Sequence, residues 1–192
     1  MPNDSRKPGI LAPFPDKAVD IAAIHDALVS VSGIDGSLVR ARWQLNPPPM
    51  PDSSTNWIAF SFNSLSVGGI PEIDHSDSDI SDPEAANSTA RIRQEMTVRV
   101  SCFGADGLNV AESIRAGLSM PFNNVALQSA GMTMLYVDPQ LVRSPDIVNG
   151  RWVDKWDVSF KIGRMANRKF NVRSIASADF SVINDKAKKL NG

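Results

Sequence analysis

The fold prediction starts from residues 90–121, which read ARIRQEMTVRVSCFGADGLNVAESIRAGLSMP. The first half alternates apolar and polar residues, with Gln94 as the exception; its apolar positions are Ile92, Met96, Val98, Val100 and Cys102. Because successive side chains of a strand point to opposite faces, this pattern predicts a half-buried strand of about a dozen residues.

The second half of the same stretch changes to a helical period. Its apolar residues recur at three- and four-residue spacing, at Leu108, Val110, Ala111, Ile114 and Leu118. This spacing predicts an amphipathic helix that is capped by Asp106 and followed by Pro121. A tight corner over residues 104–107 is expected to turn the chain from the strand into the helix, so that the two form an α/β layer.

Length and composition limit the class of protein. The 192 residues, of which 42% are hydrophobic, fit one ordinary domain with arms. A net charge of -1 argues against a dedicated nucleic-acid binder. Cys102 is the only cysteine, so no disulfide framework is possible and folding in a reducing cytoplasm is expected. Neither a signal peptide nor a membrane span is predicted, and we expect a soluble, unprocessed protein.

The N-terminal third of the sequence predicts an arm, a helix and two strands. Residues 1–15 contain four prolines and are expected to form the arm. A helix over 17–32 is expected, with Asp16 as its cap, Gly33 as its end and a buried stripe of Ile21, Ile24, Leu28 and Val31. Strands are expected over 38–43 and 57–63, joined by the proline-rich connector 46–51 in an extended, polyproline-like conformation.

The remainder predicts a long loop and two further strands. Residues 64–90 show no periodicity and are expected to form a loop whose segment 72–84 is acidic. Strands are expected over 132–138 and within the run VNGRWVDKWDVSFKIG, residues 148–163, where Asp154 interrupts the apolar row at the sheet rim. From Arg164 onward the tail is basic and contains strand-like stretches near 170–175 and 180.

These elements predict an α/β (α+β) fold with a mainly antiparallel mixed sheet and two flanking helices. The predicted organisation is an arm over 1–15, an α/β domain over 16–163 that includes the 64–90 loop, and a basic C-terminal extension over 164–192. The predicted core anchors are Trp57, Val98, Val100, Ile114, Leu118, Trp152, Trp156 and Phe160.

The sequence contains no catalytic motif that we recognise. Phosphate-binding glycine loops, HExxH, CxxC and GxSxG are all absent. His25 is expected to pack at the edge of its helix, and Cys102 to be a small buried hydrophobe. The four tryptophans are expected to pack in a core or an interface, although base stacking is the alternative. No catalytic residue, metal or cofactor is therefore predicted.

Four segments resemble the neck or tail terminator proteins of contractile-tailed bacteriophages. They read VRARWQLNPPPMP, NWIAFSF, VSCFGADGLNVAESIRAGLSMP and VNGRWVDKWDVSFKI, occur in that order, and together cover residues 38–162. The most specific part is RWxxxWxVxF following CFGxxxxxxAExIRxGL. The resemblance implies a non-enzymatic virion protein with a sandwich-like α/β sheet and flanking helices. It also implies a six-fold ring that caps the tail tube, joins it to the head-completion or connector proteins, and passes the genome through its channel without specific binding.

A closed ring requires two different complementary surfaces on each subunit, and we expect the extended segments to provide them. The connector 46–51, the loop 64–90 and the tail 164–192 are expected to contact other subunits or the tube. The acidic loop is expected either to line the channel or to meet basic residues of a neighbour. The proposed contact residues are Pro47, Pro48, Pro49, Asp74, Asp77, Asp79, Asp82, Arg168, Lys169 and Arg173.

Three alternatives remain open from the sequence. The first is another phage assembly protein, such as a head-completion or tube protein. The second is a metal-dependent enzyme that uses carboxylates of the acidic loop with His75, although the loop lacks EF-hand spacing. The third is a DNA-binding adaptor that uses the basic residues 186–189.

Overall fold

The computed structural model describes residues 18–76, 87–148 and 150–171. These residues fall into two compact units. The larger unit contains residues 18–72 and 91–167, and the smaller one contains 73–76, 87–90 and 168–171 of the described chain. The long strands β2 (Trp57–Ser76), β3 (Asn87–Phe103) and β8 (Lys155–Asn171) contribute residues to both units.

The strand and helix predicted from residues 90–121 are confirmed as β3 and α2 (Gly107–Leu118). Burial along β3 alternates as expected, and the polar exception Gln94 is also buried. Gln94 is accommodated because its Oε1 accepts a hydrogen bond from Arg164 Nε on β8 at 2.9 Å. A polar residue on the apolar face is therefore tolerated because a neighbouring strand supplies its partner.

The corner between β3 and α2 depends on Gly104. Its φ of 109° is a conformation that side chains with a Cβ rarely adopt, and a Cβ there would lie 2.2 Å from Asn56 Oδ1. The same Asn56 Oδ1 accepts a hydrogen bond from Asp106 N at 3.1 Å. Asp106 occupies the predicted N-cap position, but the expected cap bond is absent, because its side chain accepts a hydrogen bond from Asn109 Nδ2 instead.

Helix α1 spans Ile21–Ser32 and begins four residues later than predicted. Asp20 caps it by accepting a hydrogen bond from Ala23 N at 3.2 Å, and Gly33 ends it in the left-handed conformation as expected. The proposed cap Asp16 lies outside the described residues. The buried face consists of Ala23, Ile24, Ala27 and Leu28, whereas Ile21 is exposed and Val31 is only partly buried.

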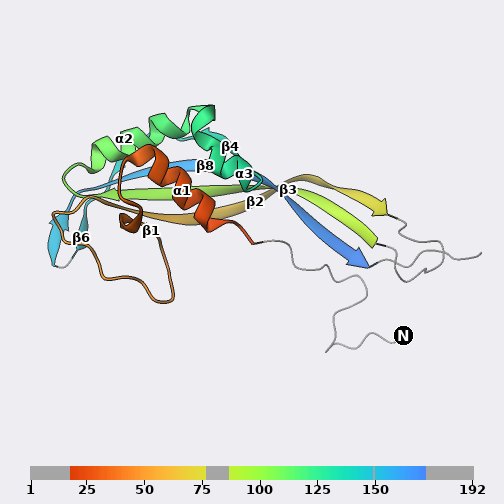
Figure 1. Ribbon diagram of the computed structural model, residues 1–192, viewed down its shortest axis with the longest axis horizontal. Coiled ribbons are helices and arrows are strands. Elements are labelled where there is room, and N and C mark those ends of the chain that lie inside the picture. The colour runs from red at the N-terminus through yellow and green to blue at the C-terminus, as the bar shows by residue number, and fades with distance from the viewer. Residues whose placement is uncertain (1–17, 77–86, 149, 172–192) are drawn as a thin grey trace, which may run out of the picture. The chain divides into compact units, whose positions relative to one another are not determined.

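The predicted α+β class is confirmed. In the described chain, the main sheet has six strands in the order β1-β2-β3-β8-β4, with β5 also paired to β8. Strand β1 (Val39–Ala41) runs parallel to β2, and β4 (Met132–Val137) and β5 (Val142–Arg143) run antiparallel to β8. In the larger unit, α1, α2 and the short α3 (Val125–Ser129) lie over one face of the sheet (Figure 1). Two 3-10 turns, η1 (Gly36–Leu38) and η2 (Pro121–Asn124), complete the elements.

The main core lies between these helices and the sheet. Its fully buried side chains come from α1, α2, α3, β2, β3 and β8, and include Ile24, Leu28, Ile58, Phe60, Val98, Val100, Ile114, Leu118, Leu127, Val158, Phe160 and Ile162. Trp156 is partly buried against this cluster. Apolar burial on this scale is the dominant stabilising term for such a layer.

A second, smaller core occupies the opposite face of the sheet. It contains Trp57, Ala59, Phe103, Val148 and Val153. The Trp57 and Phe103 rings stack with centroids 4.2 Å apart and planes 6° apart. The hairpin of β6 (Asp146–Val148) and β7 (Arg151–Val153) covers these rings with its two valines. Because an isolated two-stranded hairpin is barely stable in water, this packing holds it in place.

The hairpin corrects one prediction about the run 148–163. We expected a single strand with Trp152 and Trp156 on one buried face, but the chain breaks at Asp154 into β7 and β8. As a result Val153 is buried and Trp152, proposed as a core anchor, is 74% exposed. Alternation alone does not reveal such a break, because β7 pairs with β6 in a separate sheet.

Three predicted boundaries also differ from the structure. The loop expected over 64–90 is strand over 64–76 and 87–90, because β2 and β3 are neighbours in the sheet; residues 77–86 lie outside the described part. The boundary expected at 163/164 falls inside β8. The strand expected over 38–43 is reduced to the three residues of β1.

In the smaller unit, His75 Nδ1 lies 2.6 Å from Ser88 Oγ. No helix in the described part of the chain is both long and apolar enough to cross a membrane.

We expect Gly104→Ala to lower the free energy of unfolding by about 3 kcal/mol or more, because the added Cβ combines backbone strain with a clash against Asn56. Urea denaturation followed by circular dichroism measures the change. Gly33→Ala is the matched control, since Gly33 has a φ of 69° with open space around its Cβ position. It is expected to cost about 1 kcal/mol. Equal losses in the two variants would contradict the clash at Gly104.

Candidate functional site

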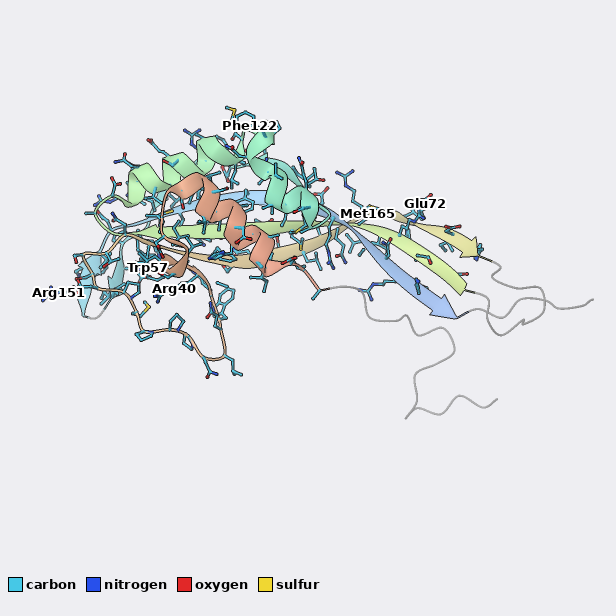
Figure 2. All side chains as sticks on the ribbon, in the orientation of Figure 1. Arg40, Trp57, Glu72, Phe122, Arg151 and Met165 are labelled. Atoms are coloured by element: carbon cyan, nitrogen blue, oxygen red, sulfur yellow. The ribbon has the colours of Figure 1, made fainter. Side chains whose placement is uncertain are left out.

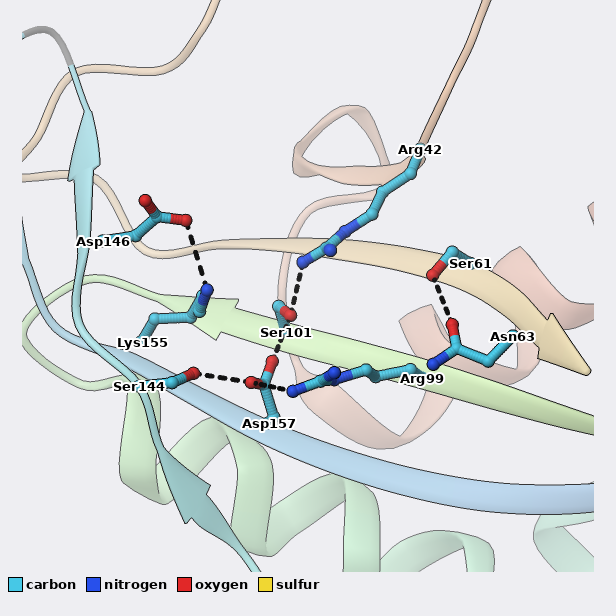
Figure 3. A network of polar contacts seen from close by, with 9 residues as sticks. All are labelled: Arg42, Ser61, Asn63, Arg99, Ser101, Ser144, Asp146, Lys155 and Asp157. Carbon is cyan, nitrogen blue, oxygen red and sulfur yellow. Dashed lines mark hydrogen bonds and ion pairs between the residues drawn. The ribbon is translucent and has the colours of Figure 1, made fainter.

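The densest polar cluster in the larger unit surrounds Asp157 on β8. Asp157 is only 4% exposed, and both of its carboxylate oxygens accept hydrogen bonds. Ser101 Oγ donates to Oδ1, whereas Arg99 Nη2 and Ser144 Oγ donate to Oδ2 at 2.7 and 2.6 Å. Arg42, which directly follows β1, donates to Ser101 Oγ (Figure 3). The network therefore ties β1, β3, β5 and β8 together.

The arrangement keeps Asp157 ionised. Burial by itself would raise the pKa of this carboxyl, but the hydrogen bonds from Ser101, Ser144 and Arg99 outweigh burial and hold its pKa below the usual value. A general base needs a raised pKa and a free lone pair facing a substrate, and Asp157 has neither feature. We interpret the network as a structural clamp between strands.

A second ion pair anchors the hairpin beside this network. Lys155 Nζ lies 3.2 Å from Asp146 Oδ2 on β6 and 5.8 Å from the centroid of the Phe103 ring (Figure 3). Hydrogen bonds from Lys155 and from Ile147 N lower the pKa of Asp146. The Lys155 side chain is mostly buried, and its ammonium group lies close to both the Asp146 carboxylate and the Phe103 ring.

Cys102 and His25, two titratable side chains considered from the sequence, are both accounted for by local contacts. Cys102 is fully buried, and burial raises the pKa of its thiol to about 12, so the thiolate needed for nucleophilic chemistry does not form at neutral pH. His25 lies at the edge of α1, with Nδ1 3.0 Å from Asp26 Oδ1 and Nε2 3.0 Å from Gly36 O. The hydrogen bond to Asp26 is the main reason that the pKa of His25 is raised.

The described residues contain no group of three or more His, Cys, Asp or Glu side chains placed to bind a metal. Of the acidic residues proposed for contacts, Asp74 is exposed at the end of β2 within the smaller unit. Asp77, Asp79 and Asp82 lie outside the described residues, as does Arg173. Arg168 and Lys169 are on β8 in the smaller unit.

The proposed contact residues Pro47, Pro48 and Pro49 lie in a fully exposed segment. We call residues 43–50 the Trp43 segment; all eight are exposed, with Trp43 at 80% and Leu45 at 95%. Trp43 has a φ of 57°, a left-handed conformation that is rare for a bulky residue. Arg40 Nη1 donates to Pro49 O at 2.6 Å, and Gln44 Nε2 donates to Ala41 O at 2.9 Å. The segment thus presents its apolar side chains on a locally fixed backbone.

The outer face of the hairpin is a second exposed apolar surface, which the sequence analysis missed. Ile147 and Trp152 are direct cross-strand partners in β6 and β7, and both are exposed. Arg151 is exposed next to them (Figure 2). The available signal was Asp154, whose interruption of the apolar row marks the point where the two strands separate. Clustered exposed Trp and Arg residues are common in protein interfaces.

The clamp gives a stability prediction. Asp157→Ala is expected to lower the free energy of unfolding at pH 7 by about 2–4 kcal/mol, since it leaves the buried Ser101 and two partly buried donors without their acceptor. Because the pKa of Asp157 is lowered in the folded state, its contribution is present above pH 4 and is lost as the pH falls through the folded-state value. Chemical denaturation between pH 7 and pH 3 measures both effects.

The matched control is Asp154→Ala. Asp154 pairs with Arg143 at the same 2.7 Å distance, but both of these side chains are largely exposed. We expect a loss below about 1 kcal/mol, because solvent screens an exposed pair. A loss at Asp154 equal to that at Asp157 would contradict the importance of burial.

The comparisons with known proteins identify the family. A family model described as "Phage neck terminator protein" matches residues 21–186, which is most of the chain. No curated protein matches the chain in sequence. The family match covers every strand and helix described above, including the hairpin and the β3–α2 corner. The chain therefore belongs to the family of phage neck terminator proteins.

Proposed function

We propose that this protein forms a six-fold ring at the head–tail junction of a contractile-tailed phage. The ring caps the tail tube, joins it to the head-completion or connector proteins and passes the genome through its channel. The protein is a structural part of the phage neck and hence of the virion, as its family indicates. In our proposal it has no catalytic activity and is assembled in the host cytoplasm.

The observation that carries the proposal is the exposure of large apolar side chains on two separate elements of the larger unit. These are Trp43 and Leu45 in the Trp43 segment, and Ile147 and Trp152 on the hairpin. A monomeric soluble protein seldom exposes such groups in clusters, because covering them with a partner is favourable. A protein that joins a head-side neighbour to a tail-side neighbour also needs two different contact surfaces.

We assign the Trp43 segment and the hairpin surface to contacts with the neighbouring head and tail proteins. The strained backbone at Trp43 supports this assignment, because strained conformations persist where a functional contact needs them. The arm 1–15, the acidic segment 72–84 and the extension 164–192 would add further contacts. The acidic segment would either line the channel, where negative charge repels DNA, or meet basic residues of a neighbour.

The first test of this proposal is the mass of the purified protein. We expect a single oligomer of six subunits that does not grow with concentration, because a ring with a closing rotation has no free ends. Native mass spectrometry and negative-stain images measure the mass and the shape. Filaments of unlimited length would favour the tube-protein alternative. A monomer that persists when the tail tube protein is added would overturn the proposal.

The second test concerns the Trp43 segment. Trp43→Gly removes the exposed indole and relieves the left-handed backbone, so the free energy of unfolding should stay within about 1 kcal/mol of the wild type. Binding to purified tail tubes or connectors should fall at least about tenfold, which corresponds to 1.4 kcal/mol. Co-sedimentation measures the binding. Leu108→Ser on α2 is the control that removes a less exposed apolar side chain; equal effects on binding would contradict the assignment.

A further inference from the structure

The main sheet of the larger unit has a free edge along β2. Strand β1 pairs only with Ile58–Phe60 of β2, and its ladder ends where Arg42 N donates to Phe60 O at 2.8 Å. Beyond that point no described strand lies on this side of β2. Residues 61–70 read SFNSLSVGGI, with neither a charged residue nor a proline, and Leu65, Val67 and Ile70 are exposed.

The direction of the backbone groups on this edge follows from the β1 pairing. Phe60 O points toward β1, and the N–H and C=O of one strand residue point to the same side, so alternate residues share that direction. The backbone groups of Phe62, Ser64 and Ser66 therefore point outward, whereas those between them face β3. Natural proteins usually protect such an edge with charges, prolines or bulges, and this ten-residue stretch has no charge or proline.

The opposite edge of the sheet is formed by β4, which pairs only with β8 among the described strands. Beside it lies an open groove of about 410 Å³ between β4 and the η2–α3 segment. Pro121, Asn124 and Gln128 line one wall, and Thr133, Leu135 and Tyr136 line the other. None of the residues that line the groove is charged. Phe122 is 74% exposed on η2 at the same end of the helical layer (Figure 2).

Asn124 lines this groove and is itself buried. Its side chain is 4% exposed, and its Nδ2 donates to Leu118 O at 3.1 Å. Its Oδ1 is the one buried side-chain oxygen or nitrogen in the described chain that has no hydrogen-bond partner. A buried acceptor without a donor costs about 1–3 kcal/mol, and native proteins rarely leave one unpaired.

We infer that the β4 groove binds the free β2 edge of a second copy of this chain. This inference rests on the proposed ring and names its subunit contact: a strand ladder that continues the sheet from one subunit into the next. Neither the β2 stretch 61–70 nor the lining of the groove contains a charged residue, so docking desolvates no charge there, and the β2 edge offers outward N–H groups to β4. The contact joins two different edges and is therefore heterologous, the type of contact from which rings are built when the rotation between subunits closes. Adding a strand to an exposed edge is a common mode of recognition.

The decisive experiment is cysteine cross-linking between copies of the full chain. Leu65 and Val67 share a face of β2 with Ala59, which packs in the second core, and Thr133 lies exposed on β4. We expect the double variant Leu65→Cys/Thr133→Cys or Val67→Cys/Thr133→Cys to form a ladder of covalent oligomers on oxidation. The corresponding single variants should form no such ladder. The native Cys102 is buried and does not interfere. Leu108→Cys/Thr133→Cys is the control pair that should not cross-link.

A backbone variant tests the same contact without new chemistry. Ser64→Pro removes an outward N–H donor but leaves the β2–β3 ladder intact, so the oligomer should dissociate at a concentration at least tenfold higher while thermal stability changes little. Ser64→Ala keeps the donor and should assemble like the wild type. A six-subunit ring that forms without cross-links and tolerates Ser64→Pro overturns the inference but keeps the proposed function. A wild-type protein that never assembles overturns both.

Discussion

Three consecutive residues of β3 bind the two faces of the sheet together, and the rest of the larger unit depends on them. Cys102 points into the core beneath the helices, whereas Ser101 and Phe103 point to the opposite face. There Ser101 donates to the buried Asp157, and Phe103 stacks on Trp57 under the hairpin. Because alternate side chains must take opposite faces, this end of the sheet is covered on both sides. Gly104 then turns the chain into α2 at once.

Both faces are covered at this end of the sheet, but elsewhere there is surface that no described residue covers. The two valines of the hairpin pack in the second core, and Ile147 and Trp152 are exposed. Among the described strands, the short β1 leaves most of the β2 edge unpaired, and the outer edge of β4 is unpaired as well. A neck protein must engage neighbours on several sides, and such uncovered apolar and backbone surfaces suit contacts with other proteins. The packing that forms the fold therefore also leaves these surfaces exposed.

Local sequence patterns correctly predicted the elements that pack against the main core, namely β3 and α2. The alternation over β3 and the helical period over α2 were sufficient, because burial against one core imposes a regular period. The same reasoning failed at two places. At Trp152 it missed that the chain passes from one sheet to another at Asp154. Over 64–76 it missed a strand, because the sequence there has no period and the strand forms by pairing with β3. Of the proposed contact residues, the three prolines lie in an exposed segment, but the hairpin and the groove beside Asn124 were not anticipated.

The sequence by itself determined the class of fold, the central strand and helix, the inert buried cysteine and the resemblance that the family match bears out. These features depend on local periodicity and on motifs that are close together in the chain. Only the tertiary structure decided that Asp157 binds Arg99, Ser101 and Ser144 and that the hairpin buries Val153 rather than Trp152. It also decided that two edges of the sheet have no further partner among the described strands. The reason is physical: which strands become neighbours is set by contacts between distant parts of the chain, and strand pairing has no local code.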